Sequence, residues 1–223
     1  MKPQIKIAET TTPDGARLIL YEHDGNYCIR LNGQELMNST IAASELALGE
    51  LACARLIGQA APCILIGGLG LGFTLKSVLK QTGPEAGVEV VELIPEVVEW
   101  NRKFLAHVNG TLLDDVRVRV SVEDVWEVLA RAGREKYDAL VMDIDNGPSA
   151  MVHKQNARLY SRTGLQRIAA ALKPGGRAAF WSARADRIFA EHLARTGLRV
   201  EAVPAKMHAN AKRCAYTVYV ADK

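Results

Sequence analysis

A short apolar run that leads into a glycine cluster constrains the fold of this chain more than any other stretch. Residues 64–73 read Ile-Leu-Ile-Gly-Gly-Leu-Gly-Leu-Gly-Phe, and a helical pattern continues from Phe73 to Leu79. This order predicts a buried strand, a tight turn and a helix. Glycine is needed where backbone lies against a ligand, and the N-terminus of a helix offers free N–H groups. We therefore expect a ligand site here; a glycine-rich turn that binds nothing is the alternative.

The spacing of the glycines narrows the class of ligand. Gly68, Gly70 and Gly72 follow a G-x-G-x-G pattern, whereas the dinucleotide fingerprint is G-x-G-x-x-G. The observed spacing is typical of S-adenosylmethionine (SAM) enzymes of the Rossmann type. Glu92 ends the next apolar run, where an acid can accept hydrogen bonds from two ribose hydroxyls. The two features together predict a SAM-type nucleoside site, and a solvated acid is the alternative for Glu92.

Strand and helix patterns alternate along the rest of the chain. After the strand that enters the glycine turn, further strands are predicted at 88–92, 116–120, 139–143, 177–181, 198–203 and 216–220. Helices are predicted at 73–79, 95–107, 122–132, 163–172 and 186–195. This alternation predicts an α/β fold with a doubly wound, Rossmann-like, mostly parallel sheet. No helix separates the last two strands, which predicts a C-terminal antiparallel hairpin.

The N-terminal residues form a different pattern. Within residues 1–38, short strand candidates at 5–8, 17–21 and 27–31 are separated by turn signals, and a helix is expected from about Ile41 to Ile57. We expect a small N-terminal β unit at 1–38 and a SAM-binding, Rossmann-like catalytic domain at 39–223. Because a lone three-stranded sheet is marginal in water, the β unit is expected to pack on the main domain or on a second subunit, and we predict a homodimer.

Composition excludes several classes of function. The net charge is +3, which is too small to indicate nucleic acid, and the five histidines show no metal-ligand spacing. The four cysteines include no C-x-x-C pair and are typical of reduced thiols. The first residues lack the apolar segment of a signal peptide, and no apolar run is long enough to span a membrane. We expect a cytoplasmic protein that binds small molecules, without a metal, a membrane or nucleic acid.

Several motifs together resemble the spermidine synthase family of aminopropyltransferases, over roughly residues 28–182. The matching segments are Leu31-Asn32-Gly33, the glycine turn at 66–72, Val91-Glu92-Leu93, Glu123-Asp124, the acidic stretch 143–148, Leu159-Tyr160-Ser161 and Leu172-Lys173-Pro174-Gly175-Gly176. The last segment is common in SAM methyltransferases, whereas Leu-Tyr-Ser after an acidic loop is more specific. The resemblance implies a Rossmann-like fold, SAM or decarboxylated SAM as donor, and an oligomer.

The resemblance also implies roles for individual residues. By it Gly68, Gly70, Gly72, Glu92 and Asp124 bind the donor, with Glu92 on the ribose and Asp124 on the adenine. Asp143 is the candidate catalytic base and Asp145 a second catalytic acid, while Glu50 and Tyr160 are candidates for substrate binding. The chain order puts most of these groups, together with Ser182, at the carboxyl ends of predicted strands, where such sheets bind ligands. A helix cap is the alternative for Asp124, and a cap of the following loop is the alternative for Asp143.

The chain also departs from the family pattern. Gly70 stands where the family has an acid that contacts the amine end of the donor, and Leu48-Gly49-Glu50 replaces a Tyr-His-Glu motif. Residues 146–185 contain seven Lys and Arg and no Asp or Glu, so a basic lid over the acceptor would repel a polycation. We therefore predict methyl transfer from SAM to a neutral or anionic small acceptor. Aminopropyl transfer from decarboxylated SAM and a non-catalytic nucleoside-binding protein are the alternatives.

Overall fold

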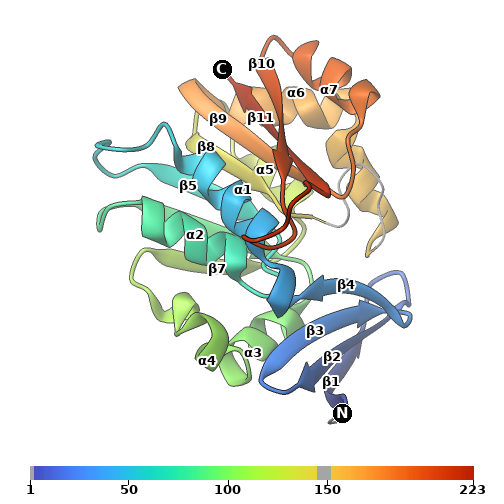
Figure 1. Cartoon of the computed structure of the whole chain (residues 1–223). Coiled ribbons are helices and arrows are strands. Elements are labelled where there is room, and N and C mark those ends of the chain that lie inside the picture. The colour runs from blue at the N-terminus through green and yellow to red at the C-terminus, as the bar shows by residue number, and fades with distance from the viewer. Residues whose placement is uncertain (1–2, 145–151) are drawn as a thin grey trace.

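Two β-sheets organise the molecule (Figure 1). The structure is a computed structural model, and it describes residues 3–144 and 152–223. The larger sheet has seven strands in the order β10-β11-β9-β8-β5-β6-β7. Its strands are β5 (Cys63–Gly67), β6 (Gly87–Glu92), β7 (Val118–Val122), β8 (Tyr137–Met142), β9 (Leu172–Ser182), β10 (Arg199–Ala205) and β11 (Tyr216–Asp222).

The strand directions follow the pattern predicted from the sequence. Strands β5 to β9 pair in parallel, whereas β11 is antiparallel to both β9 and β10. The chain winds outward from β5 through β6 to β7 and then returns to β8 on the other side, so the strand order reverses between β5 and β8. The predicted Rossmann-like α/β fold with a C-terminal antiparallel hairpin is confirmed.

Helices cover both faces of the large sheet because its central strands are apolar on both sides. In β5, Ile64 and Ile66 belong to one apolar cluster while Leu65 belongs to the other, as the pleat of a strand requires. The first cluster is covered by α1 (Ala43–Cys53), α2 (Phe73–Gln81), α3 (Pro95–Lys103) and α4 (Ala106–Asn109). The second is covered by α5 (Val125–Arg131), α6 (Arg162–Ala171) and α7 (Arg187–Ala194). Short 3-10 turns lie at Ser39–Ile41, Leu112–Asp114 and Lys154–Tyr160.

The smaller sheet is antiparallel and lies beside the glycine turn (Figure 1). Its strands are β1 (Ile5–Thr11), β2 (Arg17–His23), β3 (Asn26–Leu31) and β4 (Gln34–Asn38). Its buried face, which includes Leu18 and Ile29, joins the same apolar cluster as Leu69 and Leu71 of the glycine turn. The sequence predicted three strands here; β4 was missed because its five residues alternate too briefly to be recognised.

Some predicted boundaries were wrong. The first helix is shorter than expected, and β7 starts and ends two residues later than the predicted strand. The Lys-Pro-Gly-Gly stretch ends α6 as expected, but β9 already begins at Leu172. Leu172 pairs with Tyr137 and Arg177 pairs with Ala139, so residues 173–176 form a bulge within the strand.

Candidate active site

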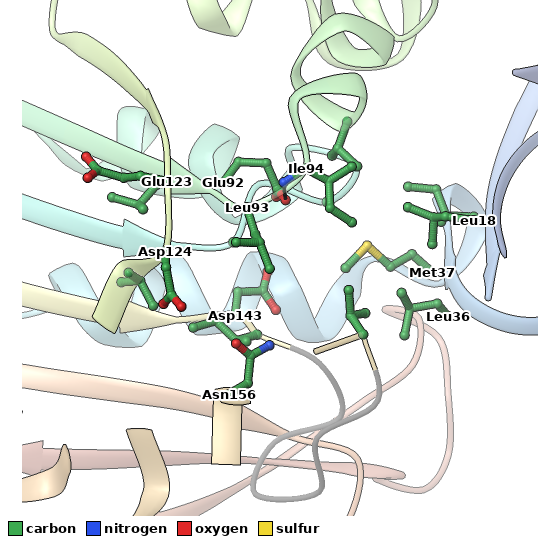
Figure 2. Close-up of a pocket in the computed structure, with 18 residues that line it drawn as sticks. Leu18, Leu36, Met37, Glu92, Leu93, Ile94, Glu123, Asp124, Asp143 and Asn156 are labelled. Carbon is green, nitrogen blue, oxygen red and sulfur yellow. Dashed lines mark hydrogen bonds between the residues drawn. The ribbon is translucent and has the colours of Figure 1, made fainter. Parts of the chain in front are cut away.

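A cavity opens where the strand order reverses, at the carboxyl ends of β5 and β8 (Figure 2). Its empty volume, which includes open solvent at the mouth, is about 670 Å³. One end is lined by Glu123, Asp124, Val125 and Ile144, and the other by apolar side chains of the small sheet and of α3. The site predicted at this edge of the sheet therefore has a physical space to occupy.

The glycine turn brings the backbone of β5 against β8. Gly68 has a φ of +89°, and a Cβ on it would lie 2.1 Å from the carbonyl oxygen of Asp143. Gly70, with a φ of +52°, lines the cavity, and a Cβ there would lie 2.5 Å from the Met37 sulfur. Gly72 directly precedes α2, and its N–H donates to the carbonyl of Leu69. Gly68 and Gly70 lie at the cavity, whereas Gly72 shapes the turn behind it.

Glu92 is buried at the end of β6 and faces the glycine turn. Its two carboxylate oxygens accept hydrogen bonds of 2.9 Å from the backbone N–H groups of Leu69 and Ile94. Burial raises the pKa of Glu92, while these N–H groups favour the ionised form. A carboxylate has about four lone-pair sites, so Glu92 keeps capacity for further donors.

Asp124 lines the same end of the cavity as Glu123 and Ile144 and is engaged by protein groups. One oxygen caps α5 by accepting a hydrogen bond from the N–H of Trp126, and the other accepts one from Arg158. The helix cap is the alternative that the sequence left open for Asp124. The Arg158 guanidinium lies 4.9 Å from the centre of the Trp126 ring. Asp124 is therefore both a helix cap and a lining group. Arg158, which sequence reasoning did not single out, fixes its position.

Asp143 follows β8 and keeps part of its surface open to the cavity. Its carboxylate accepts a 2.6 Å hydrogen bond from the Thr74 hydroxyl of α2. Desolvation, followed by the neighbouring charges of Glu45 and Glu92, raises the pKa of Asp143 to about 7. A carboxyl group that titrates near neutral pH is suited to accept and release a proton.

Glu45 is a functional candidate that sequence reasoning missed. It lies on α1, which packs so closely on α2 that a Cβ on Gly49 would lie 2.6 Å from Ser77 Cβ. This approach places Glu45 beside Asp143, and desolvation raises the pKa of Glu45 as well. Glu45 also lines a second cleft, next to the first across Leu36 and Met37, together with Glu35, Asn38, Trp181 and Tyr216.

The remaining predicted site residues lie elsewhere. Glu50 is exposed on α1 and lines none of these cavities. Tyr160 is buried, donates to the carbonyl of Ile144 at 3.3 Å and thus supports the cavity wall from behind. Ser182 donates to the carbonyl of Arg184 instead of facing the cavity. Asp145 lies outside the described residues.

Four of the seven basic residues of 146–185 are held by other groups. Arg158 pairs with Asp124, Lys173 with Asp138 and Arg177 with Asp222. Arg167 packs over the Trp126 ring at 4.1 Å. Of the acids that line the cavity, Asp124 pairs with Arg158 and Glu123 with Arg131, whereas no ion pair of Glu92 or Asp143 is found among residues 3–144 and 152–223. The expected repulsion of a polycation by a basic lid therefore has no structural basis at these positions.

Within 3–144 and 152–223, no cluster of three or more His, Cys, Asp or Glu side chains is arranged to hold a metal ion. Within the same residues, no helix has the length and apolar character needed to cross a membrane.

Comparison with known proteins identifies the family. The model of the spermine/spermidine synthase domain matches residues 56–213. The chain belongs to this family. The resemblance inferred from the sequence motifs is thereby confirmed.

Individual family members match part of the chain. A polyamine aminopropyltransferase of Mycobacterium tuberculosis is 34% identical over 122 residues, which cover 54% of this chain and 22% of that protein. One from Pyrobaculum arsenaticum is 33% identical over 115 residues, 51% of this chain and 38% of that protein. The matched part thus spans well under half the length of these curated relatives.

Solved structures show the same fold over nearly the whole chain. Spermidine synthase from Thermotoga maritima aligns with a TM-score of 0.71 at 19% identity and covers 98% of this chain and 72% of that one. A spermidine synthase in complex with the transition state analogue AdoDATO aligns with a TM-score of 0.72 at 18% identity, with the same coverage. At these identities the likeness concerns the fold.

Proposed function

We propose that this chain transfers the aminopropyl group of decarboxylated SAM to an amine acceptor. The observation that carries the proposal is the pair of carboxyl groups, Asp143 and Glu45, at the junction of the two cavities. Anionic groups suit a sulfonium donor and an amine acceptor, both of which are cationic. The names of the matching relatives support the same activity. Methyl transfer, which the sequence led us to favour, finds no support in these comparisons.

The cavity fits a nucleoside of the SAM type. Gly68 and Gly70 line the cavity with backbone, Gly68 against the Asp143 carbonyl and Gly70 beneath Met37, and Glu92 offers a buried carboxylate at the centre. Asp124 and Ile144 lie at the end that suits the base, and Asp143 lies between that end and the second cleft. In the proposal Glu92 holds the ribose and Asp124 the adenine amino group.

The chain's own residues supply positioning and a proton acceptor. When bound, the donor supplies a carbon activated by its sulfonium; the acceptor nitrogen forms the C–N bond as the C–S electron pair returns to sulfur, giving a neutral thioether. Asp143 takes the proton that the nitrogen loses, for which its pKa of about 7 suits it. Thr74 fixes the carboxylate through its hydroxyl, and Glu45 binds the cationic acceptor.

A donor–acceptor matrix with purified protein tests the proposal. SAM and decarboxylated SAM are each combined with diamines, and release of methylthioadenosine or adenosylhomocysteine is measured. We expect methylthioadenosine from decarboxylated SAM, reduced roughly 10²–10⁴-fold by Asp143→Asn. Asp138→Asn, at the opposite end of the same strand, is the matched control and should retain transfer; thermal unfolding of both variants confirms that they are folded. Adenosylhomocysteine from SAM, with no methylthioadenosine, would restore the methyl-transfer hypothesis.

Three other features of the molecule remain predictions from the sequence. We propose that residues 1–38 and 39–223 act as an N-terminal β unit and a catalytic domain. We also propose that the chain forms a homodimer to which the β unit contributes, and that it acts in the cytoplasm. The small sheet lines one end of the cavity through Leu18 and Met37, so the β unit would contribute to the site as well as to assembly.

A further inference from the structure

Met37 occupies the space directly above Gly70. A Cβ placed on Gly70 would lie 2.5 Å from Met37 Sδ and 2.7 Å from its Cε. The side chain comes from β4 of the small sheet, far from the glycine turn in sequence. Figure 2 shows it on the same side of the cavity as Leu18 and Leu36, with its thioether turned toward Glu92 and Leu93.

Among residues 3–144 and 152–223, the side chains at the end of the cavity that Met37 closes are apolar. Its lining consists of Leu18, Ile29, Leu36, Met37, Ile94 and Val97. The acids that line the cavity lie at its centre, at Glu92 and Asp143, and at the base end, at Glu123 and Asp124. With the base at Asp124 and the ribose at Glu92, the 5′ substituent of a bound nucleoside extends toward Met37. While Met37 is in place, a charged group at the tip of that substituent loses water without gaining an ionic partner, because Glu35 and Glu45 of the second cleft lie across Leu36 and Met37 from this end.

We infer that Met37 is a specificity-determining residue that closes the pocket for the 5′ substituent, so that the site holds a nucleoside with a short, neutral thioether more tightly than one with a charged tail. This inference rests on the proposed function for the orientation of the nucleoside. A donor with a charged tail must displace the Met37 thioether, which is feasible because methionine is unbranched and flexible. The neutral thioether left after transfer fits with Met37 in place.

The consequence is a product that binds better than its donor. Displacing the end of the Met37 side chain removes about one to two methyl-sized groups from apolar contact. At the usual free energy for each buried CH₂, this corresponds to roughly a tenfold difference in affinity. Methylthioadenosine should therefore bind about ten times more tightly than decarboxylated SAM or SAM.

Calorimetric binding of these three nucleosides to the full chain tests the inference without any turnover. Met37→Ala should leave the affinity for methylthioadenosine within a few-fold and bring the charged donors close to it. Met37→Glu places an acid of similar length at this end and should favour decarboxylated SAM, whose tail ends in an ammonium, over SAM. Met207→Ala, a methionine outside the residues that line either cavity, is the matched control and should keep the wild-type order. Thermal unfolding of each variant confirms that it is folded.

The outcomes separate this inference from the proposed function. If all three nucleosides bind and neither Met37→Ala nor Met37→Glu changes their order of affinity, the role of Met37 is overturned but the proposed transferase activity is not. Wild-type protein that binds decarboxylated SAM more tightly than methylthioadenosine also overturns it. The predicted order, shifted by both variants, supports it even if the donor–acceptor matrix shows no aminopropyl transfer. Failure of every nucleoside to bind overturns both.

Discussion

Replacing Asp143 by Asn should make the protein more stable at alkaline pH while it removes the proposed base. The folded protein holds this carboxyl group in a desolvated position beside Glu45, and its pKa rises from the ordinary 3.8 to about 7. Ionisation at pH 8 is therefore costly in the folded state and not in the unfolded state. An Asn is neutral at every pH and its Oδ1 can still accept the hydrogen bond from Thr74.

The size of the expected stability difference follows from the pKa shift of Asp143. Three pKa units at 1.36 kcal/mol each give an upper limit of about 4 kcal/mol, and we expect about 2–4 kcal/mol. Because the folded pKa is the higher one, the folded state binds more protons between pH 4 and 7. The free energy of unfolding of the wild type therefore falls as pH rises through this window and then levels off. The difference between Asp143→Asn and wild type should be small near pH 4 and reach its maximum above pH 7.

Urea unfolding of both proteins at several pH values between 4 and 8 measures this difference. Asp222→Asn is the matched control with the opposite sign. Its hydrogen bonds with Arg177 and Arg199 lower the pKa of Asp222, so its ionised form stabilises the folded state above pH 4. That variant should be less stable than wild type at pH 8. An Asp143→Asn protein that is less stable than wild type at pH 8, or a difference that is constant with pH, would refute the reasoning.

Three further predictions concern the site and its support. Glu92→Ala should weaken methylthioadenosine binding by about 1.5–3 kcal/mol, as for a hydrogen bond to a charged group, and an unchanged calorimetric affinity would contradict this. Gly49→Ala places a Cβ 2.6 Å from Ser77 Cβ and should lower the free energy of unfolding by about 1–3 kcal/mol in urea titrations. A Gly49→Ala/Ser77→Gly double variant should recover part of that loss, and no recovery would argue against the clash. Light scattering should give twice the mass of one chain, and a monomer at micromolar concentration would end the dimer hypothesis.

The sequence predicts well which residues at the strand ends line the cavity, because strand ends can be located from local patterns. Gly68, Glu92 and Asp143 each follow an apolar run, and parallel strands bring their carboxyl ends to one edge of the sheet. These three residues lie around the cavity as the chain order requires. No pattern within β4 indicates that Met37 reaches the glycine turn, because that contact depends on how the small sheet docks.

Helix geometry explains why Glu45, and not Glu50, lies near Asp143. Glu45 and Glu50 are five residues apart, which is about 140° around a helix at 100° per residue, so only one of them can face Asp143. The family motif pointed to Glu50. The close packing of Gly49 on Ser77 turns the face with Glu45 toward the site and leaves Glu50 in solvent. The orientation of a helix on its neighbour is set by such contacts, and it cannot be read from residue types.

Counting charged residues along the sequence did not show which basic side chains are already paired with acids. The pairing found in the structure leads to a last prediction, on the affinity for amines. Arg158, Lys173 and Arg177 are held by acids, and the acids at or beside the second cleft are Glu35, Glu45 and Asp143. Of these, Glu45 raises the pKa of Asp143. A cationic amine and a proton both relieve the repulsion between these two carboxylates, and they compete. Amine affinity should therefore fall as pH drops below about 7, where Asp143 becomes protonated. Calorimetric titration of a diamine, with methylthioadenosine already bound, at pH 6 and pH 8 measures this. Equal affinity at both pH values would show that Asp143 does not face the amine.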